Sequence, residues 1–410
     1  MAIKRGQRPL KAGDSWSIDT APGRVLYGAG VIDLVGEVVR ELGGRRVLVV
    51  TDPGVAAAGH VHRASVSLRE AGLELAVFYG VGENPGERHV AAAASAARVH
   101  EADFLIGLGG GSAMDCAKGA NFVFTNGGRM EDYWGFGKAS RPMLPSIGVP
   151  CTAGTGSEAQ SFAVISREDD HRKMACGDPK ARFLATLLDP ELVRTAPARV
   201  MAATGLDAFS HAMESFVATA ANPYSRMFAS EGFRRLLRGF EVVVEVQCPD
   251  SRAGSKPKPK TDAEINESWG DMLLGAHLAG AAIEASMLGA AHGLANPLTA
   301  RYDITHGVAV AVMLDHVVRY NGETGDTGYR GLVRLLGGEG THDGSASTRL
   351  ADSWTGLRRS AGVAGRLRDL GVEEADLEVL ATQASKQWTA QFNPRAVNAS
   401  DMLSLYEAAF

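Results

Sequence analysis

The chain has 410 residues, of which 45% are hydrophobic and 22% are charged, so it can bury a large core and is not globally disordered. Its 42 Lys and Arg residues against 47 Asp and Glu residues give a net charge of −5, which argues against nucleic acid or an anionic membrane as a partner. With about 150 residues per domain as the usual size, this length predicts more than one domain.

The cysteines and the N-terminus indicate a compartment. The four cysteines are widely spaced and form no Cys-x-x-Cys pair, which predicts a reduced chain without a disulfide framework or a thiolate zinc site. The first residues are basic but lack the apolar stretch of a secretory signal. The apolar segment 276–298 contains two histidines, a glutamate and an asparagine, so we interpret it as a buried helix of a soluble protein. These features predict a cytoplasmic globular protein.

Apolar strand-like segments alternate with helical ones along the first half of the chain. We expect strands at 46–50, 73–79 and 103–107, and helices at 31–42 and 55–71. Glycines stand at the junctions, and a further helix begins after the third strand. Parallel strands need crossover connections, so this alternation predicts an α/β domain with a parallel, doubly wound sheet, which we place at residues 1–196.

The pattern changes near Pro197. Long helices are expected at 200–220, 226–246, 265–291 and 307–320, and no alternating strand pattern follows the boundary. We therefore predict an all-helical second domain at residues 197–410. The segment 249–260, rich in Pro, Ser and Lys, has the composition of a solvent loop, with a phosphate-binding patch as the alternative.

Asp207 and His211 are the sharpest candidates for metal ligands. Their i, i+4 spacing on an expected helix places a carboxylate and an imidazole on one face. His292 and His306 lie in apolar, small-residue surroundings, where a charge would be costly. One carboxylate and three imidazoles suit Fe(II) or Zn(II), with a position left open for a substrate oxygen. The alternative is that these are hydrogen-bonded core histidines or surface donors.

The segment 109–112, Gly-Gly-Gly-Ser, follows an expected strand and opens a helix that continues through Asp115 and Lys118. Backbone N–H groups at such a helix start can face a pyrophosphate, helped by the helix dipole. The segment does not match the Gly-x-Gly-x-x-Gly pattern of dinucleotide sites, so an ordinary strand–helix turn is the alternative.

Two further segments carry groups that a dinucleotide needs. Asp52 ends an expected strand, where it could accept hydrogen bonds from a ribose 2′-hydroxyl and repel a 2′-phosphate, which favours NAD over NADP. The alternative for Asp52 is an N-cap before Pro53. Residues 150–158, Pro-Cys-Thr-Ala-Gly-Thr-Gly-Ser-Glu, gather hydroxyls and glycines as a second phosphate or nicotinamide contact would. A flexible surface turn is the alternative for that loop.

Together these segments resemble the iron-containing (group III) alcohol dehydrogenase family, and the similarity covers nearly the whole chain. The matching segments, in order, are 109–118, 150–158, 204–214, 291–298 and 306–307. The spacing from His292 to His306 also fits the family. Each segment alone is suggestive, whereas all of them in this order make the resemblance highly specific.

The resemblance implies a dinucleotide-binding α/β domain joined to a helical metal domain, with the active site in the cleft between them. It implies NAD as cofactor and a divalent ion, Fe²⁺ with Zn²⁺ or Mn²⁺ as alternatives, held by Asp207, His211, His292 and His306. The residues it implies for NAD binding are Asp52, Asn84, Gly110, Gly111, Ser112, Thr152, Thr155 and Lys173. It also implies a homodimer or a larger homo-oligomer.

The chain departs from the family pattern at two positions. Cys151 replaces the first Thr of the usual Thr-Thr-Ala-Gly-Thr loop, which removes one hydroxyl. Asn296 stands one helical turn beyond His292, where many members have a second His. An Asn amide cannot titrate, so we expect Asn296 to orient cofactor or substrate while the proton leaves through water or a cofactor hydroxyl.

These observations predict an oxidoreductase that interconverts a small primary alcohol and its aldehyde with NAD(H) and a metal. Two alternatives stay open. A dehydroquinate-synthase-like lyase shares this architecture and uses NAD and a metal without net oxidation, although it would display several Lys and Arg residues for an anionic substrate. A non-catalytic NAD- or metal-binding protein is the other alternative, and the intact set of four ligands argues against it.

Overall fold

The structure is a computed structural model that describes residues 16–19, 23–169, 172–247, 260–324, 328–337 and 345–410. The described residues form two compact units, one from those within 1–152 and 157–196, and the other from those within 153–156 and 197–410. Most of the segment 249–260, interpreted above as a loop, and the alternative of a phosphate patch there lie outside the described residues.

The first unit contains a sheet with the strand order β1-β2-β10-β7-β5-β3-β4. Only β1 (Trp16–Asp19) runs antiparallel to its neighbour, β2 (Arg24–Tyr27), and the other pairs are parallel. The remaining strands are β3 (Arg46–Val50), β4 (Glu74–Phe78), β5 (Phe104–Gly109), β7 (Ser146–Pro150) and β10 (Ala185–Leu188). A smaller sheet has the order β6-β9-β8, formed by β6 (Gly135–Phe136), β9 (Lys173–Gly177) and β8 (Phe162–Ser166).

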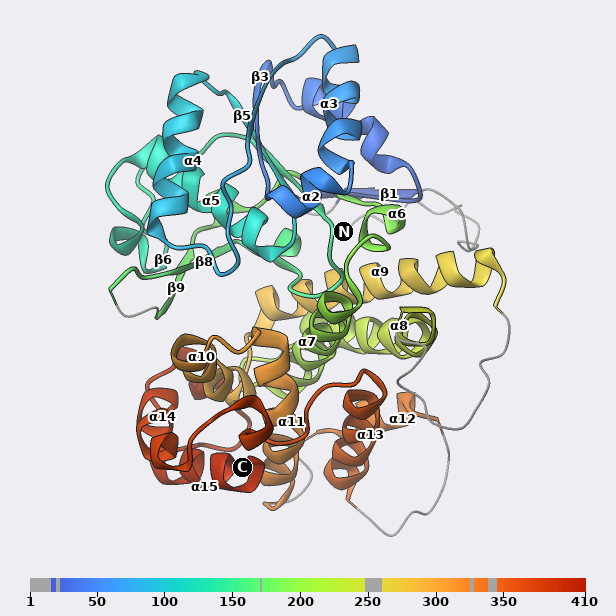
Figure 1. Ribbon diagram of the computed structural model, residues 1–410, viewed down its shortest axis with the longest axis vertical. Coiled ribbons are helices and arrows are strands. Elements are labelled where there is room, and N and C mark those ends of the chain that lie inside the picture. The colour runs from blue at the N-terminus through green and yellow to red at the C-terminus, as the bar shows by residue number, and fades with distance from the viewer. Residues whose placement is uncertain (1–15, 20–22, 170–171, 248–259, 325–327, 338–344) are drawn as a thin grey trace. The chain divides into compact units, whose positions relative to one another are not determined.

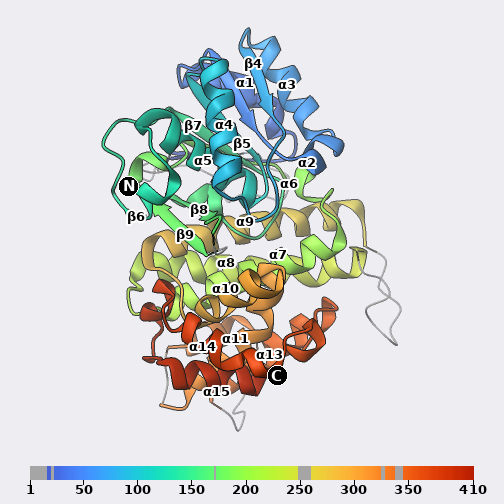
Figure 2. The same cartoon turned by 60° about the vertical axis from the view of Figure 1, so that its left-hand side comes forward.

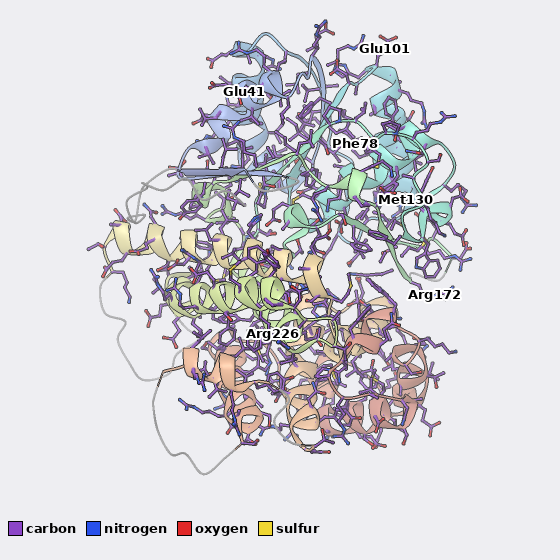
Figure 3. The ribbon with its side chains drawn as sticks, turned by 180° about the vertical axis from the view of Figure 1, so that it is seen from behind. Glu41, Phe78, Glu101, Met130, Arg172 and Arg226 are labelled. Atoms are coloured by element: carbon purple, nitrogen blue, oxygen red, sulfur yellow. The ribbon has the colours of Figure 1, made fainter. Side chains whose placement is uncertain are left out.

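Helices cover both faces of the larger sheet, as Figure 1 shows. Alternate residues of β3 enter opposite cores, because successive strand side chains point to opposite faces. Val47 and Val49 pack with α1 (Val35–Glu41) and α3 (His60–Glu70), whereas Leu48 and Val50 pack with α4 (Glu87–Val99) and α5 (Gly111–Asn126). Phe78 and Met130, labelled in Figure 3, belong to the second of these cores. The predicted doubly wound α/β fold is confirmed.

The two helices predicted at 31–42 and 55–71 are both less regular than the sequence suggests. The segment 31–42 begins as a 3-10 turn, Val31–Leu34, before α1, and the segment 55–71 divides into α2 (Pro53–Ala57) and α3. Gly59 caps α3 with φ +86, a left-handed conformation that glycine adopts without strain and that cannot continue a helix. A short α6 (Pro190–Val193) follows β10.

The described residues of 197–410 contain helices and no strand, as predicted (Figure 2). The first three helices of this unit along the chain are long and pack against one another. The helices that follow them in sequence carry His292 and His306. Phe209 of α7 lies against Phe233, Phe240 and Trp354 at ring-centroid distances of 5.6, 5.4 and 6.3 Å. The helices are α7 (Ala198–Val217), α8 (Pro223–Gln247), α9 (Asp262–Ser286), α10 (Ala290–Tyr302), α11 (His306–Gly322), α12 (Arg330–Leu335), α13 (Ala346–Ser360), α14 (Leu377–Ala384) and α15 (Ala399–Ala409).

The expectation of one helix over 265–291 is wrong, because α9 ends at Ser286 and α10 begins at Ala290 with a bend of 106°. Met287 causes the break, with φ 112 and ψ −179, a conformation that a non-glycine residue rarely adopts. Its N–H still donates to the Ile283 carbonyl at 2.9 Å, so the helix ends only after that bond. The bend gives α10 a new direction, and α10 carries His292.

Within the described ranges, no single helix is both long and apolar enough to cross a membrane. The pair α9 and α10 passes that test of length and composition only when the two bent helices are taken together. Both helices have mostly buried residues, which is also the property of core helices.

Candidate functional site

Asp207 and His211 lie one turn apart on α7, as their spacing predicts. Both are buried, with exposed fractions of 4% and 5%, and His211 Nε2 lies 3.4 Å from Asp207 Oδ1. Phe209, between them in sequence, is fully buried against the aromatic side chains of the unit's core. The packing of Phe209 therefore fixes the rotation of α7 that places Asp207 and His211 together.

His306 is the first residue of α11 and reaches the same place because of the glycine that follows it. A Cβ at Gly307 would lie 2.1 Å from the Ala203 carbonyl oxygen and 3.3 Å from Asp207 Cβ. Only glycine allows the first turn of α11 to approach α7 this closely. The sequence pair His306-Gly307 thus combines a candidate ligand with the residue that allows its helix to approach.

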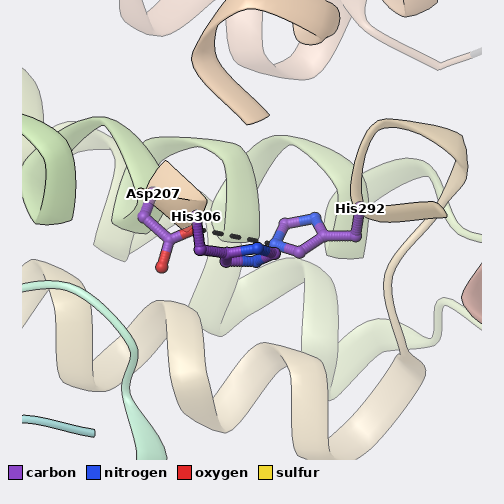
Figure 4. Close-up of side chains that lie close together, drawn as sticks. All are labelled: Asp207, His292 and His306. Atoms are coloured by element: carbon purple, nitrogen blue, oxygen red, sulfur yellow. Dashed lines mark ion pairs between the residues drawn. The ribbon is translucent and has the colours of Figure 1, made fainter. Parts of the chain in front are cut away.

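His292 completes the cluster from α10. Its ring stacks on that of His211 with a centroid distance of 4.9 Å and an interplanar angle of 24°, and its centroid lies 5.3 Å from that of His306. His292 Nε2 is 3.6 Å from Asp207 Oδ1. One ligand atom from each of Asp207, His292 and His306 lies within 4.8 Å of the others, and Figure 4 shows the three side chains converging.

Burial and mutual attraction set the charge states of this cluster. Burial raises the pKa of Asp207, but the imidazoles of His211, His292 and His306 outweigh it and hold that pKa well below its ordinary range. Burial lowers the pKa of His211 by more than Asp207 raises it. For His292 the balance is reversed, since Glu214 and Asp207 overcome burial and raise its pKa to about 9. The cluster therefore holds an ionised carboxylate among buried imidazoles.

The cluster fits a divalent metal ion. Asp207 Oδ1 and His292 Nε2 are buried atoms that have no hydrogen-bond partner among the described residues, and such atoms are costly unless something satisfies them. A carboxylate with imidazole nitrogens suits Fe(II) and Zn(II). The four predicted ligands are thus brought together, since His211 Nε2 also lies beside Asp207.

Glu214 is a buried residue to which the sequence analysis assigned no role. Its Oε2 contacts His292 Nδ1, and its Oε1 accepts a hydrogen bond from the Ala291 N–H at 2.8 Å. The available signal was spacing: Glu214 follows His211 by three residues on α7, which places both side chains on one helix face.

The predicted phosphate turn opens α5 in the first unit. Gly109 has φ +150, and a Cβ there would lie 2.8 Å from Ala113 Cβ and 3.2 Å from Asp52 Oδ2. Gly110 is the N-cap of α5 and makes no side-chain cap, so the first N–H groups of the helix have no capping side chain of their own. Gly111 and Ser112 form the first turn of this helix. Such a helix start is suited to an anionic phosphate.

Asp52 is the N-cap of α2, which is the alternative role that its sequence position before Pro53 predicts. Its Oδ1 accepts hydrogen bonds from the Gly54 and Val55 N–H groups at 2.8 and 3.0 Å. Its Oδ2 faces Gly109, the residue that begins the phosphate turn. One carboxylate oxygen therefore caps α2, and the other oxygen faces the phosphate turn at the start of α5.

Thr152 also lies next to the turn, because a Cβ at Gly110 would be 3.4 Å from Thr152 Oγ1. Burial raises the pKa of the Asp115 carboxyl, and Lys173 at the start of β9 is one of the groups that partly oppose this rise. Asn84 lies in the loop after β4 with φ 48, a left-handed conformation that Asn tolerates better than most residues.

Thr155 belongs to the second unit. The glycines on either side of it lie close to two helices of that unit. A Cβ at Gly154 would lie 2.4 Å from Thr204 Cβ of α7, and one at Gly156 would lie 2.6 Å from Gly280 Cα of α9. The Gly-Thr-Gly sequence is therefore needed for close packing, and the alternative of a flexible surface turn is wrong for this stretch.

Lys118 and Asp115 hold the next part of this loop in the first unit. Lys118 is 1% exposed, and its Nζ donates to the carbonyls of Ser157 and Phe162 at 2.7 and 2.9 Å. Ser157 Oγ donates to Asp115 Oδ1 at 2.6 Å. The matching of Asp115 and Lys118 to the family motif thus has a structural reason, because both side chains fix the loop after β7.

Asn296 lies on α10, one turn beyond His292, and is half-buried. Its Nδ2 donates to Gln387 Oε1 at 3.1 Å, which satisfies one of its donors. The side chain therefore has a protein partner, while a role toward substrate or cofactor stays a prediction.

Comparisons with known proteins agree with this geometry. A family model described as "Iron-containing alcohol dehydrogenase" matches residues 22–190, and one described as "Fe-containing alcohol dehydrogenase family, C-terminal" matches 201–410. The 1,3-propanediol dehydrogenase of Klebsiella pneumoniae is 33% identical, covering 94% of this chain and 96% of its own. The NAD-dependent methanol dehydrogenase of Bacillus methanolicus is 30% identical, covering 95% and 98%. A crystal structure of a 1,3-propanediol oxidoreductase has a TM-score of 0.86 at 31% identity, covering 98% and 100%.

Proposed function

The chain belongs to the iron-containing alcohol dehydrogenase family, and on that premise we propose that it interconverts a small primary alcohol and its aldehyde with NAD(H) and a divalent metal. The observation that carries the proposal is the convergence of Asp207, His292 and His306, with His211 beside them, in a buried cluster. The relatives named above support the substrate class, since their names specify a diol and an alcohol. None of them supports the lyase alternative.

Asp207, His211, His292 and His306 would hold the metal, with Fe²⁺ as the first choice and Zn²⁺ or Mn²⁺ as alternatives. A bound divalent ion would supply a Lewis acid that polarises the substrate oxygen. The residues themselves provide an ionised carboxylate and imidazoles in a site with little access to water. Glu214 keeps the His292 ring in place through Nδ1, so that Nε2 faces Asp207.

The first unit would bind NAD through the start of α5 and the loop residues around it. NAD would supply the two-electron acceptor for the alcohol. The backbone N–H groups of Gly111 and Ser112 would donate to the pyrophosphate, and the missing side chain at Gly109 permits close approach. Asp52 would accept from a ribose hydroxyl through Oδ2 and disfavour a 2′-phosphate by charge. Asn84, Gly110, Thr152, Thr155 and Lys173 are proposed as the other cofactor contacts.

Asn296 is proposed to orient substrate or cofactor. Its amide has no titration near neutral pH, so it cannot carry the alcohol proton. The proton would leave through water or a cofactor hydroxyl. The bond from Asn296 to Gln387 limits its rotation, which is what an orienting side chain requires.

We also propose a cytoplasmic homodimer or larger homo-oligomer that binds neither nucleic acid nor membrane. The cysteines in the described part of the chain, Cys116, Cys151 and Cys176, are buried free thiols, which supports a reducing compartment. Size-exclusion chromatography with light scattering tests the oligomeric state, and a monomer at micromolar concentration would contradict that part.

The activity is tested with metal-free protein reconstituted separately with Fe²⁺, Zn²⁺ and Mn²⁺. Each sample is assayed on a panel of short primary alcohols and their aldehydes with NAD(H) and NADP(H), by the absorbance of the reduced cofactor. We expect net NADH formation with an alcohol and net NADH consumption with its aldehyde. No net cofactor change with any metal would contradict the proposal and would favour the lyase or the binding protein.

A further inference from the structure

Glu214 contacts two different parts of the segment that carries His292. Its Oε2 contacts His292 Nδ1, and its Oε1 accepts from the backbone N–H of Ala291, the second residue of α10. Glu214 is 5% exposed and belongs to α7, the helix of Asp207 and His211. One carboxylate thus links the start of α10 to the helix that carries the other candidate ligands.

The start of α10 depends on side chains from elsewhere in the chain. Its N-cap residue, Gly289, offers no side chain, and a Cβ there would lie 2.9 Å from Glu214 Oε1 and 3.0 Å from Asn393 Oδ1. Asn393 Oδ1 accepts from the Ala290 N–H at 3.3 Å and belongs to a buried amide pair with Asn321. Asn393 and Glu214 therefore cap the first two N–H groups of α10. At an exposed helix start, water would bind these N–H groups instead.

We propose that Glu214 is a positioning residue that sets which nitrogen of His292 is available to the metal. This inference rests on the proposed metal site. Glu214 faces Nδ1 of His292, so when a metal displaces the Nε2 proton the ring keeps its proton on Nδ1 and directs Nε2 toward Asp207. A carboxylate behind a metal-binding histidine fixes ring orientation and tautomer in this way.

The chemistry of the Ala291 contact makes this assignment specific. A backbone N–H is only a donor, so the Glu214 oxygen that faces it must be an acceptor. A Gln at this position has one acceptor and one donor end. If its carbonyl stays on Ala291, its amide N–H faces Nδ1 and forces the neutral ring to place its proton on Nε2. If it turns over, two N–H groups meet at the start of α10. One orientation of Gln therefore reverses the bond to His292, and the other loses the bond to Ala291.

The test is the dissociation constant for Zn²⁺ and Co²⁺, measured by chelator competition on the full chain with Glu214→Gln. We expect a loss of affinity of about 10- to 100-fold, the usual effect of removing a partner behind a metal-binding histidine. The matched control is Asp376→Asn, at the other end of α10, where Asp376 accepts from Arg301 and from the Tyr302 hydroxyl. That variant loosens α10 without touching His292, and we expect its metal affinity to stay within about threefold of wild type, below the range for such partners.

A second measurement does not depend on the folding of any variant. In zinc-loaded wild-type protein labelled with ¹⁵N-histidine, the His292 ring should retain a proton on Nδ1 that exchanges slowly with water, with the metal on Nε2. Metal bound to Nδ1 would overturn the proposal, as would a Glu214→Gln protein that binds Zn²⁺ as tightly as wild type. Failure of the proposed function is a different result, namely a wild-type protein that binds no metal.

Discussion

Asp207 Oδ1 lies 3.6 Å from Nε2 of His292, and in the part of the chain that the structure describes neither buried atom has a hydrogen-bond partner. The two residues come from α7 and α10, which are separated by two long helices in sequence. A fold that buries a carboxylate oxygen and an imidazole nitrogen face to face without a hydrogen bond needs a third group between them. A divalent ion is the group that this set of residues suits best.

The charge of Asp52 should select the cofactor. Because its Oδ1 caps α2, Asp52→Asn is the suitable change, since it keeps an oxygen for the Gly54 N–H, removes the charge and replaces the acceptor that faces the turn by an N–H donor. We expect the ratio of kcat/KM for NADPH over NADH to rise about tenfold, within the cost of about 1–3 kcal/mol for an unsatisfied polar group. Steady-state kinetics with both cofactors measure the ratio. A wild-type protein that already prefers NADP(H) would show that Asp52 does not face the ribose.

Asn296→Ala should leave the metal in place and slow the reaction. The Ala side chain cannot reach substrate or Gln387, so a polar partner loses a bond worth about 1–3 kcal/mol, and kcat/KM should fall about tenfold. Metal content and steady-state constants are measured for the variant and for the wild-type protein. Unchanged constants would mean that Asn296 serves only the packing of α10. Loss of metal would mean that Asn296 belongs among the ligands.

Met287→Gly should stabilise the junction of α9 and α10. A non-glycine residue at φ 112 and ψ −179 costs on the order of 1–3 kcal/mol, and glycine gives back about 0.5–1 kcal/mol in entropy, for a net gain of about 1 kcal/mol. The melting temperature should rise, and hydrogen exchange of the amides in 286–292 should slow. Met227→Gly is the matched control, because Met227 is a 49% exposed residue inside α8, where glycine should destabilise by about 1 kcal/mol. Equal melting temperatures for both variants would show that Met287 is not strained.

His60 should make the first unit sensitive to acid. It is 4% exposed, and its Nε2–H donates to Thr195 Oγ1 at 2.7 Å, because the Thr195 hydroxyl itself donates to the Leu192 carbonyl. Burial lowers the pKa of His60 below the unfolded value of about 6.5. The unfolded chain therefore binds more protons in this range, so the stability from His60 is complete above about pH 6.5 and is lost as the pH falls below it.

His60→Gln should therefore reduce the drop in melting temperature between neutral and mildly acidic pH. The matched control is His62→Gln on the same helix, because His62 is exposed. Thermal unfolding across this pH range measures the difference. The same acid sensitivity in wild type and His60→Gln would show that another group is responsible.

The parts of the fold that the sequence could predict are those with a local signal. Periodic apolar residues predicted β3, β4 and β5 of the parallel sheet and most of the long helices, and the Asp207–His211 spacing placed two side chains on one helix face. The break at Met287 could not be predicted, because a strained non-glycine residue leaves no mark in the composition. Glu214 was missed for another reason. Its two partners, Ala291 and His292, are distant in sequence, and only the packing of α10 on α7 reveals the contact.

The most direct test of the central claim is the metal content of wild-type, His211→Ala and His306→Ala proteins. Each is stripped, incubated with Fe²⁺ or Zn²⁺, freed of unbound metal and analysed by elemental mass spectrometry. We predict one equivalent of metal per wild-type chain, with metal and turnover lost in both variants while their melting temperatures show that they remain folded. A full equivalent retained in both variants would contradict the assignment of Asp207, His211, His292 and His306 as the metal site.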